Sequence, residues 1–291
     1  MIEPDEIHRV TSFDGTRIAC QVFGQGSAIV VGNGIGVGYR GLALQIARLR
    51  QRFRVVSWDH RGIFRSAAPG SGGTGVRAHA RDCLAVMDAL GLAQAGYLGW
   101  SMGVQVGFEV ARLQPGRLSR LAGIGGVAGD TFRAALPLPA LPRLVPRALA
   151  AAVPLARLAR PLVRRIIAAD GFFRAACLSG YVRPHADREV FMTMARGVAE
   201  HDPALYLTTL AALGRHDATA VLPDLAVPVL FLAGAEDHMT PRRVLERLAR
   251  MAPKGRVHVV AGASHFVTIE APDEVGRVLE QFFSEPEGAR K

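Results

Sequence analysis

Gly99-Trp100-Ser101-Met102-Gly103 is the most informative stretch of this chain. It follows the short apolar run 97–99 and precedes 104–113, which has helical character. A serine in a sharp turn between a strand and a helix has strained backbone, and its hydroxyl projects beyond the sheet. The flanking glycines let the strand and the helix approach closely. Because the chain holds 32 glycines, such a pentapeptide also arises by chance, so its meaning depends on the other segments.

The length suits one large α/β domain or one domain that carries an insertion, and by itself it would also permit two domains. Of the 291 residues, 49% are hydrophobic, which supplies a sizeable core and excludes a disordered chain. The acidic start, residues 1–6, lacks the basic and apolar regions of a signal peptide, and no stretch is apolar enough to span a membrane. The three cysteines, Cys20, Cys83 and Cys177, are scattered along the chain. This pattern is typical of reduced thiols in a cytoplasmic protein.

The net charge of +10 comes almost entirely from arginine, which supplies 33 of the 35 basic residues. Residues 131–200 hold eleven arginines against four acidic residues and so carry +7 of this charge. Aromatic residues are not interleaved with the arginines as a base-stacking surface requires. We therefore expect no nucleic-acid partner, and only weak attraction to anionic membrane surfaces or acyl anions.

Short apolar runs alternate with helical stretches along most of the chain. This order predicts a mostly parallel sheet with helices on both faces. A hairpin is expected where Asp14-Gly15 separates two strands, and Thr240 is expected to cap a helix that begins at Pro241. The expected strands are 10–12, 17–23, 28–31, 55–58, 97–99, 121–124, 229–233 and 257–260, and the helices are 42–50, 77–90, 104–113, 241–251 and 272–283.

The section 130–220 interrupts this alternation. It contains no evident buried strand, and recurring prolines separate helical pieces rich in Ala, Leu and Arg. We interpret it as a helical cap inserted into a core formed by 1–129 and 221–291. A separate helical domain is the alternative, but the chain returns to the sheet afterwards.

Two later segments supply partners for the serine. A serine nucleophile needs a general base, and that base needs an orienting carboxylate. Such groups converge beyond the carboxyl ends of parallel strands, which is where Asp237 and His265 are expected. Glu236 and Asp130 compete with Asp237 for the role of the acid. The backbone N–H of Met102, at the start of the helix after Ser101, is one expected oxyanion donor.

The order Ser101, Asp237, His265 resembles that of the α/β-hydrolase fold superfamily, over roughly residues 10–283. The likeness is to its carboxylesterases and lipases. It implies Asp237 as the acid, because 234–241 matches the family pattern. It also implies Ile35 as the second oxyanion donor, since Asn33-Gly34 stands where much of the family has His-Gly.

Two loops depart from the family pattern. The Asn-Gly-Ile-Gly sequence at 33–36 is similar to the loop of intracellular polyhydroxyalkanoate depolymerases. The segment 59–66 resembles the D-x-R-G-x-G-x-S loop of the family, but Phe64 replaces a glycine, so a different turn is expected. Asp59 and Arg61 are expected to form hydrogen bonds within loops.

These features predict a serine hydrolase of carboxylic esters that needs no metal or cofactor and acts on a small molecule as a monomer or homodimer. Short-to-medium acyl chains are expected. The side chains expected to contact substrate are Asn33, Trp100, His238 and Phe266. Apolar cap residues either line an acyl pocket or pack among the cap helices: Phe172, Phe173, Phe191, Met192 and Met194.

Other readings remain. A carbon–carbon bond hydrolase or a polyhydroxyalkanoate depolymerase would use the same residues, and a non-catalytic α/β-hydrolase could bind a signalling ligand. A dinucleotide-binding dehydrogenase is a further alternative, because the glycines of 32–38 resemble its phosphate-binding loop. However, Val37 or Tyr39 stands where the third glycine of that motif belongs.

Overall fold

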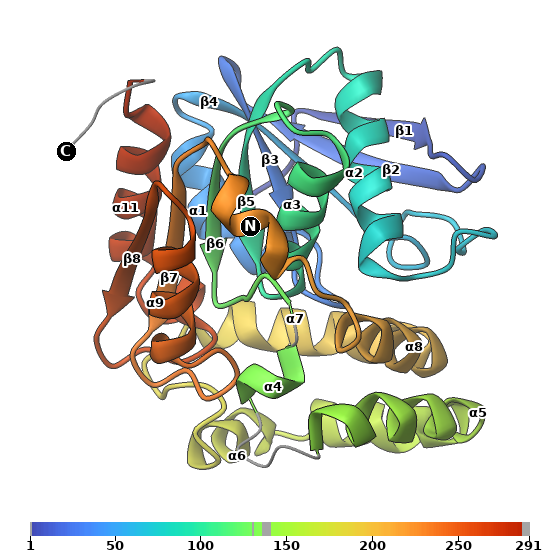
Figure 1. Ribbon diagram of the computed structural model, residues 1–291. Coiled ribbons are helices and arrows are strands. Elements are labelled where there is room, and N and C mark those ends of the chain that lie inside the picture. The colour runs from blue at the N-terminus through green and yellow to red at the C-terminus, as the bar shows by residue number, and fades with distance from the viewer. Residues whose placement is uncertain (1, 130, 136–140, 287–291) are drawn as a thin grey trace.

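The computed structural model describes residues 2–129, 131–135 and 141–286. Its centre is an eight-stranded sheet of order β1-β2-β4-β3-β5-β6-β7-β8 (Figure 1). β1 and β2 are antiparallel to their neighbours, and all other pairs are parallel, as predicted. The strands are β1 Glu6–Thr11, β2 Arg17–Phe23, β3 Ser27–Gly32, β4 Phe53–Trp58, β5 Ala95–Trp100, β6 Leu118–Ile124, β7 Val229–Gly234 and β8 Gly255–Val260.

Helices cover both faces of the sheet, and each face has its own apolar core. Side chains alternate between the two cores along a strand, so Tyr97 faces one core and Leu98 the other. This arrangement explains why the strands are almost continuously apolar. One core contains α2 Val76–Ala89, α3 Met102–Leu113 and α9 Arg242–Met251, and the other contains η1 Tyr39–Leu42, α1 Ala43–Leu49, α10 Val267–Glu270 and α11 Pro272–Ser284.

The described residues between β6 and β7 form helices joined by loops, with no strand apart from an isolated bridge between Gly129 and Asp217. α7 and α8 lie next to the sheet, and α5 packs on their far side (Figure 1). The prolines do not separate short helices as expected, because Pro146, Pro154 and Pro161 lie inside α5. The elements are α4 Thr131–Ala135, α5 Leu141–Ala168, α6 Phe172–Leu178, α7 Arg188–Glu200, α8 Pro203–Leu213 and η2 Thr219–Asp224.

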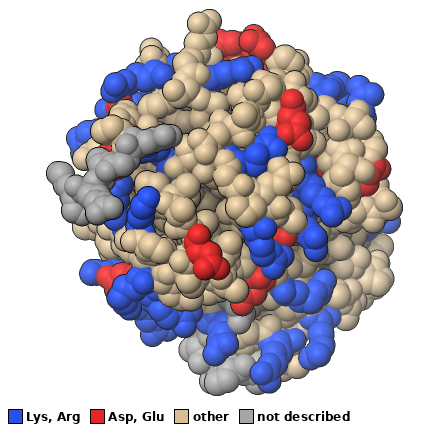
Figure 2. All heavy atoms as spheres, turned by 45° about the horizontal axis from the view of Figure 1, so that its top comes forward, with Lys and Arg blue, Asp and Glu red and all other residues tan. Residues whose placement is uncertain are grey.

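Basic side chains are distributed over the face shown in Figure 2, and acidic side chains are fewer there. This distribution agrees with the net charge of +10. None of the helices in the described part of the chain is long and apolar enough to cross a membrane.

Candidate active site

Ser101 lies in the turn between β5 and α3. Its φ of +54° falls in the left-handed region that non-glycine residues rarely adopt. The glycines on both sides are required by close backbone contacts. A Cβ on Gly103 would lie 2.0 Å from the carbonyl oxygen of Gly32, and one on Gly99 would lie 2.7 Å from the carbonyl oxygen of Gly103. The turn therefore holds Ser101 at the carboxyl edge of the sheet.

Three side chains from distant segments form one hydrogen-bonded chain with Ser101 at its end. Nε2 of His265 lies 3.1 Å from Oγ of Ser101, and Nδ1 of His265 lies 2.9 Å from Oδ2 of Asp237. His265 follows β8 and Asp237 follows β7, so neighbouring parallel strands deliver the imidazole and the carboxylate to the same edge. The structure thus brings together the three residues that the sequence singles out.

Asp237 is held as a carboxylate by the surrounding donors. Its Oδ1 accepts from the backbone N–H groups of Met239 and Thr240 at 2.8 and 2.9 Å. Burial by itself raises the pKa of Asp237, but the charge and hydrogen bond of His265 and the hydrogen bonds from Thr240 outweigh it and lower the pKa to about 2. The prediction that Thr240 caps α9 is wrong, because its hydroxyl donates to Asp237 at 2.5 Å and Pro241 occupies the N-cap.

The competing acids differ in their surroundings. Glu236 forms an ion pair with Arg183, which lies between α6 and α7, and no hydrogen bond joins it to His265 within the described residues. Asp130 lies outside the described residues. Of the acids that the structure describes, Asp237 is the one in contact with the imidazole.

Ile35 and Met102, the residues expected to supply the oxyanion donors, both line a small cavity of about 20 Å³, whose lining does not include Ser101 or His265. Met102 begins α3, where the first N–H groups have no partner within the helix, and the helix dipole favours negative charge there. Ile35 follows Gly34, and a Cβ on Gly34 would lie 3.7 Å from the Cβ of Ser101. Both backbone segments therefore lie beside the serine.

Asn33 turns its side chain toward the sheet. Its Nδ2 donates to Oγ of Ser57 and to the carbonyl oxygen of Trp58, both at 3.0 Å, and the residue is buried. These bonds attach the loop after β3 to the end of β4. In this structure Asn33 therefore holds the loop that carries Ile35.

Trp100 and Phe266 lie against the imidazole of His265. The indole Nε1 of Trp100 donates to the carbonyl oxygen of His265 at 3.4 Å. The ring of Phe266 contacts the rings of Trp100, Tyr181 and Phe191, with centroids 5.0–6.0 Å apart. The ring of Phe191 also stacks on that of Phe172 and meets that of Phe173 edge to face, so these aromatic residues pack between α6 and α7.

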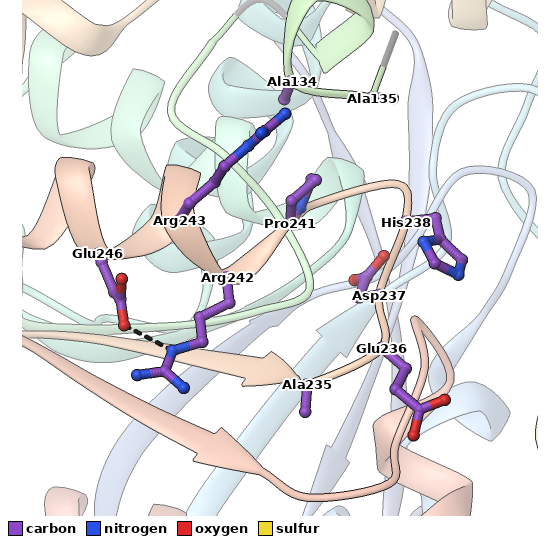
Figure 3. Close-up of a pocket in the computed structure, with 10 residues that line it drawn as sticks. All are labelled: Ala134, Ala135, Ala235, Glu236, Asp237, His238, Pro241, Arg242, Arg243 and Glu246. Atoms are coloured by element: carbon purple, nitrogen blue, oxygen red, sulfur yellow. Dashed lines mark hydrogen bonds and ion pairs between the residues drawn. The ribbon is translucent and has the colours of Figure 1, made fainter. Parts of the chain in front are cut away.

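His238 follows Asp237 in the loop after β7. It lines an open pocket of about 590 Å³ between α4 and α9, together with Arg242 and Arg243 (Figure 3). Neither Ser101 nor His265 is among the residues that line this pocket. Asp237 does line it, so the pocket adjoins the site, but no hydrogen bond joins His238 to Ser101 or His265 among the described residues.

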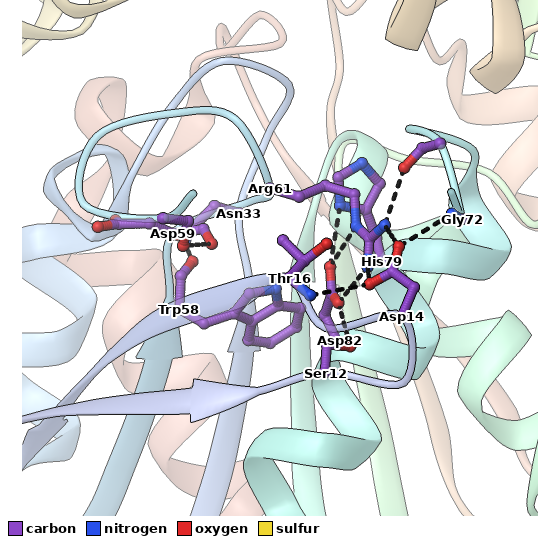
Figure 4. Close-up of polar contacts among 12 residues, drawn as sticks. Ser12, Asp14, Thr16, Asn33, Trp58, Asp59, Arg61, Gly72, His79 and Asp82 are labelled. Atoms are coloured by element: carbon purple, nitrogen blue, oxygen red, sulfur yellow. Dashed lines mark hydrogen bonds and ion pairs between the residues drawn. The ribbon is translucent and has the colours of Figure 1, made fainter. Parts of the chain in front are cut away.

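The loop 59–66 is anchored by a buried arginine. Arg61 donates to the carboxylate of Asp82 on α2 at 2.6 and 2.9 Å and to Asp14 of the β1–β2 hairpin at 2.8 Å (Figure 4). Burial lowers the pKa of the neighbouring His79 to about 3, so its imidazole is neutral. Phe64 has a φ of +49°, so it takes a conformation typical of the glycine it replaces.

Sequence reasoning missed a carboxylate that supports the histidine loop. Glu270 accepts hydrogen bonds from the backbone N–H of Ser264 at 2.5 Å, the hydroxyl of Ser264 at 2.6 Å and the backbone N–H of Arg183 at 2.8 Å. The Ser264 hydroxyl also lies 3.2 Å from the carbonyl oxygen of Tyr181. The one available signal was a carboxylate shortly after the histidine in an otherwise apolar stretch.

The described residues contain no group of His, Cys, Asp and Glu side chains that could hold a metal ion. The site brings together a serine hydroxyl, an imidazole and a carboxylate, an arrangement that is suited to acyl transfer.

The fold and this arrangement define the class of protein. A model of the α/β hydrolase fold family matches residues 32–272, and the chain belongs to that family. The matched range includes the glycine-rich loop after β3. This loop therefore belongs to an α/β hydrolase fold and not to a dinucleotide-binding domain.

Relatives of known name are moderately similar. The chain is 27% identical over 261 residues to the putative carbamate hydrolase RutD of Agrobacterium fabrum, covering 87% of this chain and 92% of that protein. It is 30% identical over 258 residues to the RutD of Caulobacter vibrioides, covering 87% and 89%. A thermophilic esterase from Thermogutta terrifontis superposes with a TM-score of 0.74 at 23% identity, covering 95% and 97%, which bears on the fold alone.

Proposed function

We propose that this hydrolase cleaves carboxylic esters of short-to-medium acyl chains by way of an acyl-enzyme on Ser101. The observation that carries the proposal is the hydrogen-bonded chain from Ser101 Oγ through His265 to Asp237. His265 would take the serine proton as Oγ attacks the ester carbonyl, and would then give that proton to the departing alcohol.

The remaining groups have supporting roles in this proposal. The N–H groups of Ile35 and Met102 stabilise the negative charge that develops on the carbonyl oxygen. Asp237 holds Nδ1–H of His265 and so keeps Nε2 free to accept the proton. In the second half of the reaction His265 takes a proton from water, which attacks the acyl-enzyme, and returns it to Oγ as the acid leaves.

We also infer that the helices α4–α8 act as a cap over the site. Two contacts of the inserted helices with the loop after β3 support this role. His201 at the end of α7 lies 3.0 Å from the carbonyl oxygen of Gly36 through its Nε2, and a Cβ on Gly36 would lie 3.1 Å from the ring of Tyr206 on α8. Phe191 of α7 adds an apolar contact to Phe266.

Carbamate cleavage is a second candidate, favoured by the names of the relatives that cover most of this chain. Attack on a carbamate carbonyl needs the same nucleophile, base and oxyanion donors. The two candidates differ in the group attached to the carbonyl carbon, which is a carbon chain in a carboxylic ester and a nitrogen in a carbamate. The apolar surroundings of Phe266 and Phe191 suit the carbon chain better.

The test compares p-nitrophenyl esters of increasing chain length with a p-nitrophenyl carbamate, which release the same chromophore. We expect higher kcat/KM for the esters, labelling of Ser101 by a fluorophosphonate, and a loss of roughly a thousandfold or more in Ser101→Ala. Ser27→Ala, an exposed position, is the control. Full esterase activity in Ser101→Ala would refute the mechanism, and a preference for the carbamate would refute the ester assignment.

A further inference from the structure

α5 presents a stripe of apolar side chains to solvent. Leu155, Leu158 and Leu162 are 66%, 78% and 61% exposed, whereas large aliphatic side chains are normally buried. Exposed aliphatic residues recur every three or four positions along the helix, which places them on one face. The stripe consists of Leu144, Ala148, Ala151, Leu155, Leu158, Leu162 and Ile166. At 1.5 Å per residue it is about 33 Å long.

The rest of the protein holds the opposite face of α5. Pro146 and Ala156 are buried, and the helix packs along α8 and α7. Arg157 forms an ion pair with Asp202 at 2.7 Å, and Arg164 forms one with Glu200 at 2.8 Å. α5 is the layer farthest from the sheet (Figure 1), and the exposed fractions of Leu155, Leu158 and Leu162 show that the stripe faces solvent.

The charge around the stripe has a single sign. The sequence of α5 contains no aspartate or glutamate. Its six arginines are Arg143, Arg147, Arg157, Arg160, Arg164 and Arg165. Arg143, Arg147 and Arg165 are exposed beside the stripe, and no ion pair engages them among the residues that the structure describes.

This charge selects among possible occupants of the stripe. Two copies of α5 pairing along their stripes would bring arginines together without an acidic partner, which opposes association. The helix contains no aromatic residue on which nucleic-acid bases could stack. An apolar face bordered by arginines matches a surface of acyl chains under anionic headgroups, with the helix lying in the plane of the interface.

We propose that α5 docks this protein onto anionic lipid membranes, with Leu155, Leu158 and Leu162 entering the acyl-chain boundary and Arg147 and Arg165 contacting lipid phosphates. The docking is separate from the ester chemistry, so it holds or fails independently of the proposed function. It would place the inserted helices, rather than the opposite edge of the sheet, against the lipid.

The test is co-sedimentation of the full chain with vesicles of phosphatidylcholine alone and of phosphatidylcholine mixed with phosphatidylglycerol. We expect binding to the mixed vesicles that weakens as salt is raised. Leu158→Ser with Leu162→Ser should reduce binding roughly tenfold or more, and Arg147→Gln with Arg165→Gln should reduce it roughly tenfold at low salt.

Matched controls change exposed residues of the same type elsewhere, namely Ile7→Ser with Leu44→Ser for the apolar pair and Arg77→Gln with Arg243→Gln for the basic pair. Thermal unfolding of each variant verifies that the fold is retained. Absence of binding to both kinds of vesicle would overturn the proposal. So would equal losses in the control variants, or a dimer in solution that the leucine substitutions dissociate.

Discussion

Ser101 combines a strained backbone with a hydrogen-bonded side chain. A non-glycine residue at a φ of +54° costs of order 1–3 kcal/mol, which the surrounding structure must offset. The close approaches at Gly99 and Gly103 leave the backbone little alternative. The turn places Oγ 3.1 Å from Nε2 of His265, so the fold itself positions the hydroxyl beside the imidazole.

Asp237 makes the stability of the site dependent on pH. Its pKa falls from 3.8 to about 2 on folding, so its contribution is complete above pH 3.8 and is lost as the pH falls through about 2. The contribution amounts to roughly 2 kcal/mol. We expect the free energy of unfolding of Asp237→Asn to lie below that of the wild type. This difference should shrink by about the same 2 kcal/mol as the pH falls from 5 to 2.

The measurement is the free energy of urea unfolding for both proteins across that range. Asp88→Asn serves as the control, because Asp88 pairs with Arg117 at the surface. A gap that stays constant with pH would contradict the assignment of the low pKa to Asp237.

At the scale of elements, the loop that carries His265 depends on α10 and on the inserted segment. Glu270 accepts three hydrogen bonds, two from Ser264 and one from Arg183. A buried carboxylate with several donors is a rigid junction, because removing any partner leaves a polar group unpaired. We therefore regard Glu270 as a positioning residue for His265.

Replacing Glu270 by Gln tests this role. The amide nitrogen of glutamine cannot accept, so at least one donor of Ser264 or Arg183 loses its partner. We expect kcat to fall roughly tenfold while KM changes little, since the base shifts but the acyl site remains. Glu274→Gln is the control, because Glu274 pairs with His258 at 2.8 Å on the surface. A fall confined to thermal stability, with kcat unchanged, would reject the positioning role.

Elements with strong local signals were predicted well, and those defined by long-range contacts were not. Apolar runs predicted the core strands, and helical periodicity predicted the core helices. Both patterns can be recognised from the residues of the element itself. The helix α5 runs through three prolines, because its packing along α8 overrides their local preference. The Thr240 prediction failed for a local reason, because its hydroxyl donates to Asp237, three positions earlier in the same loop, and Pro241 takes the N-cap of α9.

Across the whole molecule, Arg61 links three separate segments. It joins the loop after β4 to α2 through Asp82 and to the β1–β2 hairpin through Asp14. All three side chains are nearly inaccessible to solvent. Removing one member of such a buried ionic group leaves uncompensated charge, which costs more than the group itself contributes.

Arg61→Met should therefore destabilise the protein by about 3–5 kcal/mol, because two buried carboxylates lose their cation. Urea unfolding followed by circular dichroism measures the change. Arg77→Met, an exposed position on α2, should shift the free energy of unfolding by less than about 0.5 kcal/mol. Equal effects of the two substitutions would show that the ionic group is not what stabilises this region.

The sequence singled out Ser101, Asp237 and His265, which the structure brings into one hydrogen-bonded chain, because each follows a strand end that its own residues mark. It did not reveal Glu270, since the contact with Arg183 joins positions 87 residues apart. The contact of His238 with substrate stays a prediction, because its side chain lines a pocket whose lining does not include Ser101 or His265. Side-chain direction within a loop depends on the neighbours that the fold supplies.

The tryptophans of this chain give the site an optical reporter. The chain has only two, and Trp58 and Trp100 are both buried. Trp100 donates its indole N–H to the backbone of His265, with its ring 6.2 Å from the imidazole. In a Trp58→Phe background, ultraviolet emission would come from Trp100 alone. Proton transfer to His265, or acylation beside it, would then be followed by fluorescence in real time without a chromogenic substrate.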